Sequence, residues 1–192
     1  MRNLDPRARA AFLASAGLLV AGLLVSLGAF TAGVRVVGLG LVAIALWLGR
    51  GDVVRRTVRA SGLTRFMAFA LLAGYAWLAT AGVLWILEAS VVAGPGRDAM
   101  LHVLFLGFVM SMIFAHAPVI LPAVLRLEVA WAPTAYAPLA LLHASLLARV
   151  VADLAGVPEA LRWAGLANVA AIVLFLLDTA RTRLRSRRRT HV

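Results

Sequence analysis

Cysteine is absent from the 192-residue sequence, and so is lysine, which means that all 19 basic residues are arginine. The absence of cysteine excludes disulfide bonds, iron–sulfur clusters, thiolate metal sites and covalent c-type haem attachment. Acidic residues number only eight, which gives a formal net charge of +11. Such a charge is typical of nucleic-acid partners in a soluble protein, but in an apolar chain its distribution carries topology information. We therefore expect a lipid bilayer and no nucleic acid as the partner.

The sequence has little polar surface of any kind. Hydrophobic residues make up 63% of it and the mean hydropathy is +0.95, values that indicate a multi-pass membrane protein. The N-terminal stretch has a basic flank and an apolar core. That core is too long for a signal peptide and no convincing cleavage site follows it, so we interpret it as the first membrane span.

Six segments are apolar and long enough to cross a bilayer as helices. They predict an all-α fold, a bundle of about six transmembrane helices forming one domain over residues 1–181, followed by a basic cytoplasmic tail over 182–192. A break predicted at 31–35 makes the first two spans a tight helical hairpin. The predicted spans are 10–30, 33–49, 65–90, 99–124, 134–154 and 161–181.

The arginines are distributed unevenly over the predicted connections, and this asymmetry predicts the orientation. With both termini in the cytoplasm, 15 arginines lie on the inner side and only 4, Arg35, Arg97, Arg149 and Arg162, on the outer side. The terminal arginines are interpreted as a topology signal, with contact to anionic lipid head groups as the alternative.

Three histidines lie in the apolar spans, where such side chains are functional-site candidates by default. His102 and His116 are 14 residues apart in the fourth span. On an ideal helix they differ by about 40° around the axis and by about 21 Å along it. They cannot bind the same metal ion, although the spacing is typical of helices that hold two stacked haems. The second helix of that pattern needs two histidines, and here it has only His143.

Depth in the membrane pairs two of these histidines. His116 and His143 lie at nearly equal distances from the inner side on consecutive antiparallel spans. We expect them to be axial ligands of haem b or ligands of copper, since imidazole is the usual ligand of both. His102 is expected near the outer surface as a second-site ligand or electron-path residue. Its expected neighbours are Glu88, Trp85 and Asp98.

Other residues complete the expected site. Arg126 and Arg149 follow His116 and His143 in the chain and are candidates to bind haem propionates. Pro118 and Pro122 either kink the helix and open room for a cofactor, or end it early. Tyr75 and Trp77 lie deep in the third span and are candidates to line a pocket. The alternative for every histidine is a hydrogen bond that only packs helices together.

The segment HVLFLGFVMSMIFAHAPVILPAVL, residues 102–125, resembles part of the NnrS family, with His102, Leu104 and Gly107 matching the family's opening of a span. It also resembles the histidine-bearing helices of subunit I of haem-copper oxidases. The resemblance covers spans four to six. It implies a haem- or copper-containing protein of the bacterial cytoplasmic membrane, linked to nitric oxide response. NnrS proteins have about twice the length, and a complete oxygen- or NO-reducing centre needs more histidines.

These observations lead to one expected function and two alternatives. The first is a haem b- or copper-binding integral membrane protein in electron transfer or in nitric oxide and metal response, as a redox subunit rather than a stand-alone enzyme. The second is a non-catalytic subunit that anchors or stabilises a larger respiratory complex. The third is a small transporter whose pathway residues are Glu88, Asp98 and Asp153.

Overall fold

The structure, a computed structural model, describes residues 5–50, 52–125 and 131–189. The described residues are almost entirely helical and contain no strand. The elements are α1 (Pro6–Ser26), α2 (Phe30–Arg50), α3 (Asp52–Thr57), α4 (Gly62–Leu87), α5 (Pro95–His102), the π-helical segment η1 (Val103–Val109), α6 (Met110–Leu125), the short 3-10 turn η2 (Pro133–Ala135), α7 (Tyr136–Ala155) and α8 (Pro158–Arg189).

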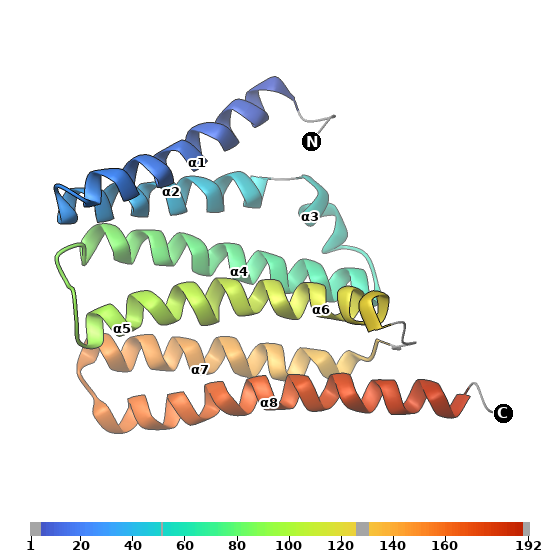
Figure 1. The fold of residues 1–192 in the computed structure, drawn as a ribbon. Helices are drawn as coiled ribbons and strands as arrows, with labels where there is room; N and C mark the ends of the chain where they lie inside the picture. The colour runs from blue at the N-terminus through green and yellow to red at the C-terminus, as the bar shows by residue number, and fades with distance from the viewer. Residues whose placement is uncertain (1–4, 51, 126–130, 190–192) are drawn as a thin grey trace.

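Among the described residues, six helical segments are long and apolar enough to cross a membrane, which confirms the predicted bundle. Consecutive spans run up and down side by side, so that α4 lies between α2 and the α5–α6 span, and α7 between that span and α8 (Figure 1). Large apolar side chains on α1 and α8 are exposed. A bilayer is the environment that covers such faces, and the chain is a multi-pass membrane protein.

The first hairpin turns earlier than predicted. Its connection is Leu27–Ala29, and α2 begins at Phe30, so the predicted break at 31–35 is wrong. Gly33 does not make the turn. It lets α2 approach α1, because a Cβ there would overlap the backbone of Ser26. Close approach through small residues is the usual way in which membrane helices associate, since lipid removes the hydrophobic drive between them.

The predicted division between the last span and a tail at 182 stays a prediction, but no helix end marks it. Helix α8 continues without a break to Arg189. The sequence after Gly165 contains neither glycine nor proline, and arginine is a good helix former. The basic segment therefore prolongs the sixth span as a helix.

The start of α1, the short helix α3 and the end of α8 lie at the same end of the bundle (Figure 1). The connection before Pro95 lies at the opposite end. The arginine-rich segment 50–65 and both termini therefore share one side, as the arginine count requires. Which side faces the cytoplasm stays a prediction.

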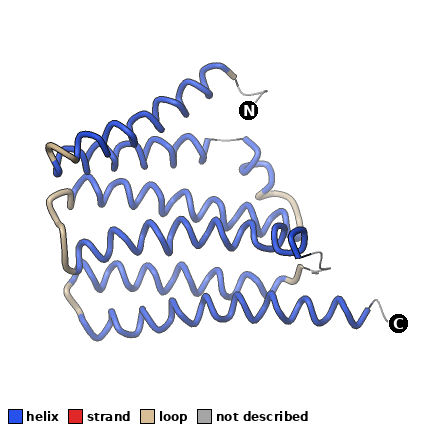
Figure 2. Tube along the Cα trace, in the orientation of Figure 1, coloured by secondary structure: helices blue, strands red, loops and turns tan. Residues whose placement is uncertain are grey.

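The fourth span is one continuous helical run from Pro95 to Leu125 (Figure 2). Pro118 and Pro122 lie inside α6, so neither ends the helix, and the last turns of α6 leave the line of the preceding ones (Figure 1). A kink is the expected effect of proline inside a helix. In the same helix, Phe114 stacks on Phe175 of α8 with ring centroids 3.8 Å apart, and both belong to one buried apolar cluster.

Candidate functional site

A hydrogen bond between two spans defines the candidate site. Trp77 Nε1 on α4 donates to His143 Nδ1 on α7, with the two nitrogens 3.0 Å apart. The other ring nitrogen, His143 Nε2, is buried and has no hydrogen-bond partner among the described residues. A buried polar atom without a partner is costly, and it calls for an explanation such as a bound ligand.

The tryptophan determines which nitrogen of His143 carries the proton. An indole N–H is a donor only, so Nδ1 must offer its lone pair to Trp77. In a neutral imidazole the other nitrogen then carries the hydrogen. His143 therefore presents an Nε2–H group, a hydrogen-bond donor that still lacks an acceptor.

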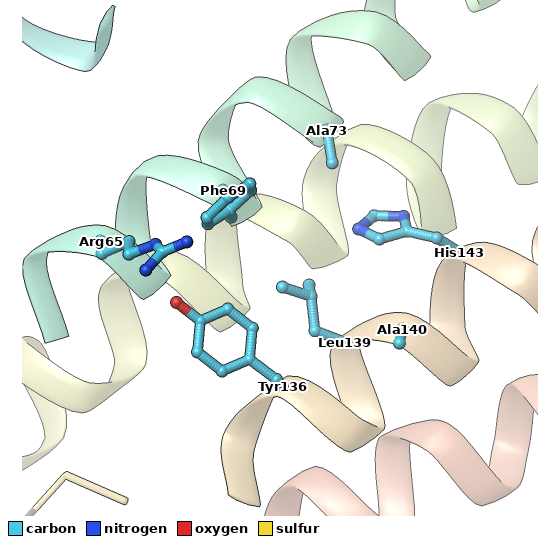
Figure 3. A pocket seen from close by; sticks show the side chains of 7 residues that line it. All are labelled: Arg65, Phe69, Ala73, Tyr136, Leu139, Ala140 and His143. Carbon is cyan, nitrogen blue, oxygen red and sulfur yellow. The ribbon is translucent and has the colours of Figure 1, made fainter. Parts of the chain in front are cut away.

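This donor stands at one end of a cavity between α4 and α7 with a volume of about 510 Å³. Figure 3 shows the tip of the His143 ring directed into the cavity, with Leu139 between it and Tyr136. At the other end, the Arg65 guanidinium lies beside the Tyr136 hydroxyl. The remaining lining residues are apolar: Phe69, Ala73, Leu139 and Ala140. The cavity is thus an apolar slot with polar groups at its two ends.

The local sequence explains how Trp77 reaches this position. Gly107 in η1 lies directly against the indole, because a Cβ there would be 2.6 Å from Trp77 Cβ and 2.7 Å from Trp77 Cγ. The π-helical turn is closed by the bond from the Met110 N–H to the Phe105 carbonyl. Such turns are rare and often found at functional sites. Gly107 and the π turn together allow Trp77 to pass between the spans and bond His143.

The other two intramembrane histidines have the opposite proton arrangement. His116 Nδ1 lies 2.7 Å from the Met112 carbonyl, and His102 Nδ1 lies 2.7 Å from the Asp98 carbonyl. A carbonyl oxygen only accepts, so Nδ1–H donates and Nε2 keeps its lone pair. In this tautomer the histidine can bind a metal ion through Nε2. His116 is exposed on the outside of the bundle, whereas His102 is half-buried.

The π turn also changes the relation between His102 and His116. A π turn holds one residue more than an α turn, which rotates everything beyond it by about 100°. The two histidines are therefore about 140° apart around the helix rather than about 40°. The predicted difference of about 40° is wrong because it assumed a regular α-helix through 103–109.

His116 and His143, the residues expected to ligate haem or copper, have different partners in this structure. His143 faces Trp77 and the cavity, while His116 is exposed and bonded to its own helix. His143 Nε2 carries a hydrogen and cannot ligate without losing it. Among the described residues, no three histidine, aspartate or glutamate side chains gather where they could hold a metal ion. Arg126 lies outside the described residues.

Arg149 has a different partner from the propionate that was expected. Its Nε lies 3.7 Å from Asp153 Oδ2, one turn further along α7, and Asp153 is buried, with 4% of its surface exposed. His102 and Asp98 on α5 lie close enough to act electrostatically on this carboxylate. The i, i+4 spacing of Arg149 and Asp153 was the available signal for this pair. Arg149 was expected to bind a haem propionate, and Asp153 was a candidate residue of a transport pathway.

The two deep aromatic residues of α4 have different surroundings. Tyr75 lines a second cavity beside α1 and α2, which confirms its predicted role, and Trp77 stands behind His143. Sequence analysis missed Arg65 and Tyr136 as cavity residues. They lie near the ends of their spans, where arginine and tyrosine usually mark the membrane interface.

Comparison with known proteins identifies the family but attaches no activity to it. A family model described as "Domain of unknown function (DUF8744)" matches residues 1–184, and the chain therefore belongs to that family. No curated protein and no solved structure matches the chain.

Proposed function

We propose that this DUF8744 member is a membrane-embedded binding protein that takes an apolar molecule from the bilayer into the α4–α7 cavity. The molecule carries a hydrogen-bond acceptor, and His143 Nε2–H donates to it. One observation carries the proposal, namely the buried Nε2 that lacks a partner and points into the cavity. An acceptor from a ligand satisfies that donor, which no described protein group does.

The shape and surroundings of the cavity support a ligand that arrives from the lipid. Its walls are apolar, and two lining residues, Phe69 and Ala140, are exposed on the outside of the bundle. Small-molecule sites are commonly apolar clefts in which a few polar groups fix the orientation. An apolar molecule dissolved in the bilayer can enter between α4 and α7 without crossing water.

Matched amphiphiles test this proposal with the purified protein in lipid nanodiscs. The set comprises a long-chain alkane, the alkyl methyl ketone of the same length and the corresponding alcohol. The ketone presents an acceptor without a competing donor, so we expect it to raise the thermal unfolding temperature by mass action. The alkane is expected to give no shift, and His143→Phe is expected to abolish the effect of the ketone.

The control is His116→Phe, which removes an exposed histidine outside the cavity and is expected to leave the ketone effect intact. Equal stabilisation by alkane and ketone would show that binding does not need a hydrogen-bond acceptor, and it would contradict the proposal. If the ketone stabilises the His143→Phe variant as much as the wild type, His143 is not the donor to the ligand.

Binding of haem b or copper by His116 is a second candidate function, and one specific observation favours it. The Nδ1–H of His116 is held by the Met112 carbonyl, which leaves Nε2 as a free lone pair directed from the outer surface of the bundle. Such an exposed ligand needs a second one from another chain, which agrees with a subunit of a larger complex. The resemblance of residues 102–125 to NnrS proteins supports the same redox role in the bacterial cytoplasmic membrane.

Visible spectra and metal analysis of protein from a haem- and copper-replete host test this second candidate. A dithionite-reduced spectrum with haem bands, or stoichiometric copper, that disappears in His116→Ala supports it. The same signal in a His116→Ala variant, or wild-type protein containing neither cofactor, would contradict it. His143→Gln is expected to retain any such cofactor, since His143 does not present a lone pair.

A further inference from the structure

We infer that the ligand of the α4–α7 cavity is a lipid-soluble para-quinone, held by hydrogen bonds from His143 Nε2–H to one carbonyl oxygen and from the Tyr136 hydroxyl to the other. This inference rests on the proposed function and gives the chemical class of its ligand. It comes from the spacing of the two donors along α7 and from the apolar slot that joins them.

The two donors lie on one face of one helix. Tyr136 and His143 are seven residues apart on α7. On an α-helix this spacing is about 10.5 Å along the axis with a rotation of only about 20°. Both side chains line the same cavity, and in Figure 3 Leu139 lies between them. Tyr136 and His143 therefore border one common cavity.

The length of a para-quinone matches this spacing. Its two carbonyl oxygens are roughly 5 Å apart across the ring, as ordinary bond lengths require. Each hydrogen bond adds about 2.8 Å. The two donors of a bridged quinone are then about 11 Å apart, of the same order as the axial rise between the Cα atoms of Tyr136 and His143.

The charge at the Tyr136 end also suits a carbonyl. The Arg65 guanidinium lies beside the Tyr136 hydroxyl in Figure 3 and stands over the Phe69 ring, 5.4 Å from its centroid. A cationic donor strengthens a hydrogen bond to oxygen. A fatty-acid carboxylate also suits Arg65, but its alkyl chain would then lie against His143 and leave the buried Nε2–H unsatisfied.

The apolar residues of the slot accommodate the ring and its tail. Phe69, 40% exposed, and Ala140 on the outside of α7 leave a way for an isoprenoid tail into the bilayer. Leu139 lies between the two donors, and His143 Nε2 is buried. A ring that reaches both donors must therefore displace the Leu139 side chain.

Equilibrium binding of a benzoquinone with a short alkyl tail tests the inference with the full-length protein in nanodiscs. Saturable binding at one site is expected. Tyr136→Phe removes the hydroxyl but keeps the ring that packs against Phe66, and His143→Phe removes the imidazole donor. Each change is expected to weaken binding roughly ten-fold, the effect of one unsatisfied hydrogen bond.

Two further variants separate hydrogen bonding from other roles of the histidine. His143→Gln places an amide that accepts from Trp77 and donates to the quinone, so binding is expected to recover to within a few-fold of wild type. Trp163→Phe, on an exposed face of α8 outside the cavity, serves as the control and is expected to bind the quinone normally. Variants are compared only where size-exclusion profiles and thermal unfolding match the wild type.

The outcomes distinguish the inference from the proposed function. Tighter binding of a fatty acid than of a quinone with the same tail would overturn the quinone as the ligand. The proposed amphiphile site would then be retained only if His143→Phe weakens binding of the fatty acid. Quinone binding that is unaffected by both Tyr136→Phe and His143→Phe would overturn the two-donor site. Absence of binding by quinone, ketone and fatty acid alike would contradict both proposals.

Discussion

Trp77 and His143 are the only described pair of side chains in which one span donates a hydrogen bond to the imidazole of another, and the bond is 3.0 Å long. It joins α4 to α7 at a point where the fourth span has a π turn and a glycine against the indole. The bond has a chemical consequence, because it assigns the proton of His143 to Nε2.

Trp77→Phe is expected to remove the hydrogen bond that fixes the proton of His143 on Nε2, while keeping an aromatic ring in place. His143 Nδ1 loses its donor, so both neutral tautomers become populated. We expect a loss of stability of about 1 kcal/mol for the hydrogen bond, measured by thermal unfolding. Nitrogen-15 NMR of histidine-labelled protein checks the tautomer, and an unchanged spectrum for His143 would contradict the role given to Trp77.

Gly107→Ala is expected to displace the indole. The new Cβ would lie 2.6 Å from Trp77 Cβ, and overpacking of this kind costs roughly 1–3 kcal/mol. Thermal unfolding and the fluorescence of Trp77 measure the effect. Gly49→Ala is the matched control, because a Cβ at Gly49 on α2 meets nothing within 4 Å. Equal behaviour of the two alanine variants would contradict the close contact.

The ion pair between Arg149 and Asp153 predicts an asymmetric response to mutation. Arg149→Met leaves the buried Asp153 carboxylate without its cation, a change expected to cost about 3–5 kcal/mol. Changing both residues together, Arg149→Met with Asp153→Leu, is expected to recover most of that loss. Denaturant unfolding in detergent gives the two values. A double variant less stable than Arg149→Met alone would show that burial of the Asp153 carboxylate does not destabilise the protein when Arg149 is removed.

The fold was largely predictable from the sequence, whereas the site was predictable only in part. Apolar length alone gives the six spans, because a bilayer demands about 20 residues of helix for each crossing. Gly33 was misinterpreted as a turn, since sequence cannot distinguish a glycine that breaks a helix from one that lets two helices touch. The π turn could not be predicted either, because it adds one residue to a helical turn without any change in hydropathy.

The histidines show a second limit of sequence reasoning. Depth placed His116 and His143 at one level, but it carries no information on which way each ring faces across the bundle. Trp77 was predicted to line a pocket, and its bond to His143, which joins residues 66 positions apart, was not predicted. The proton assignment follows from that bond alone, and it separates a donor histidine from the metal-competent tautomer of His116.

The orientation of the bundle is predicted from arginine and tested by reporters. A fusion at residue 192 is expected to give a cytoplasmic signal, and one in the loop 93–98 an external signal, because 15 arginines against 4 favour that arrangement. Reversal of both signals would place Arg65 and the Tyr136 end of the cavity at the outer face. The site itself would remain unchanged.

Nitrogen-15 NMR of histidine-labelled protein in lipid bilayers, recorded with and without the alkyl methyl ketone, tests the central claim most directly. The account predicts a protonated Nε2 and an unprotonated Nδ1 for His143 in both samples, with the Nε2 resonance shifting when the ketone binds and the His116 signals unchanged. An unprotonated Nε2 in the ligand-free protein, or a ketone that binds without moving the His143 resonance, would contradict it.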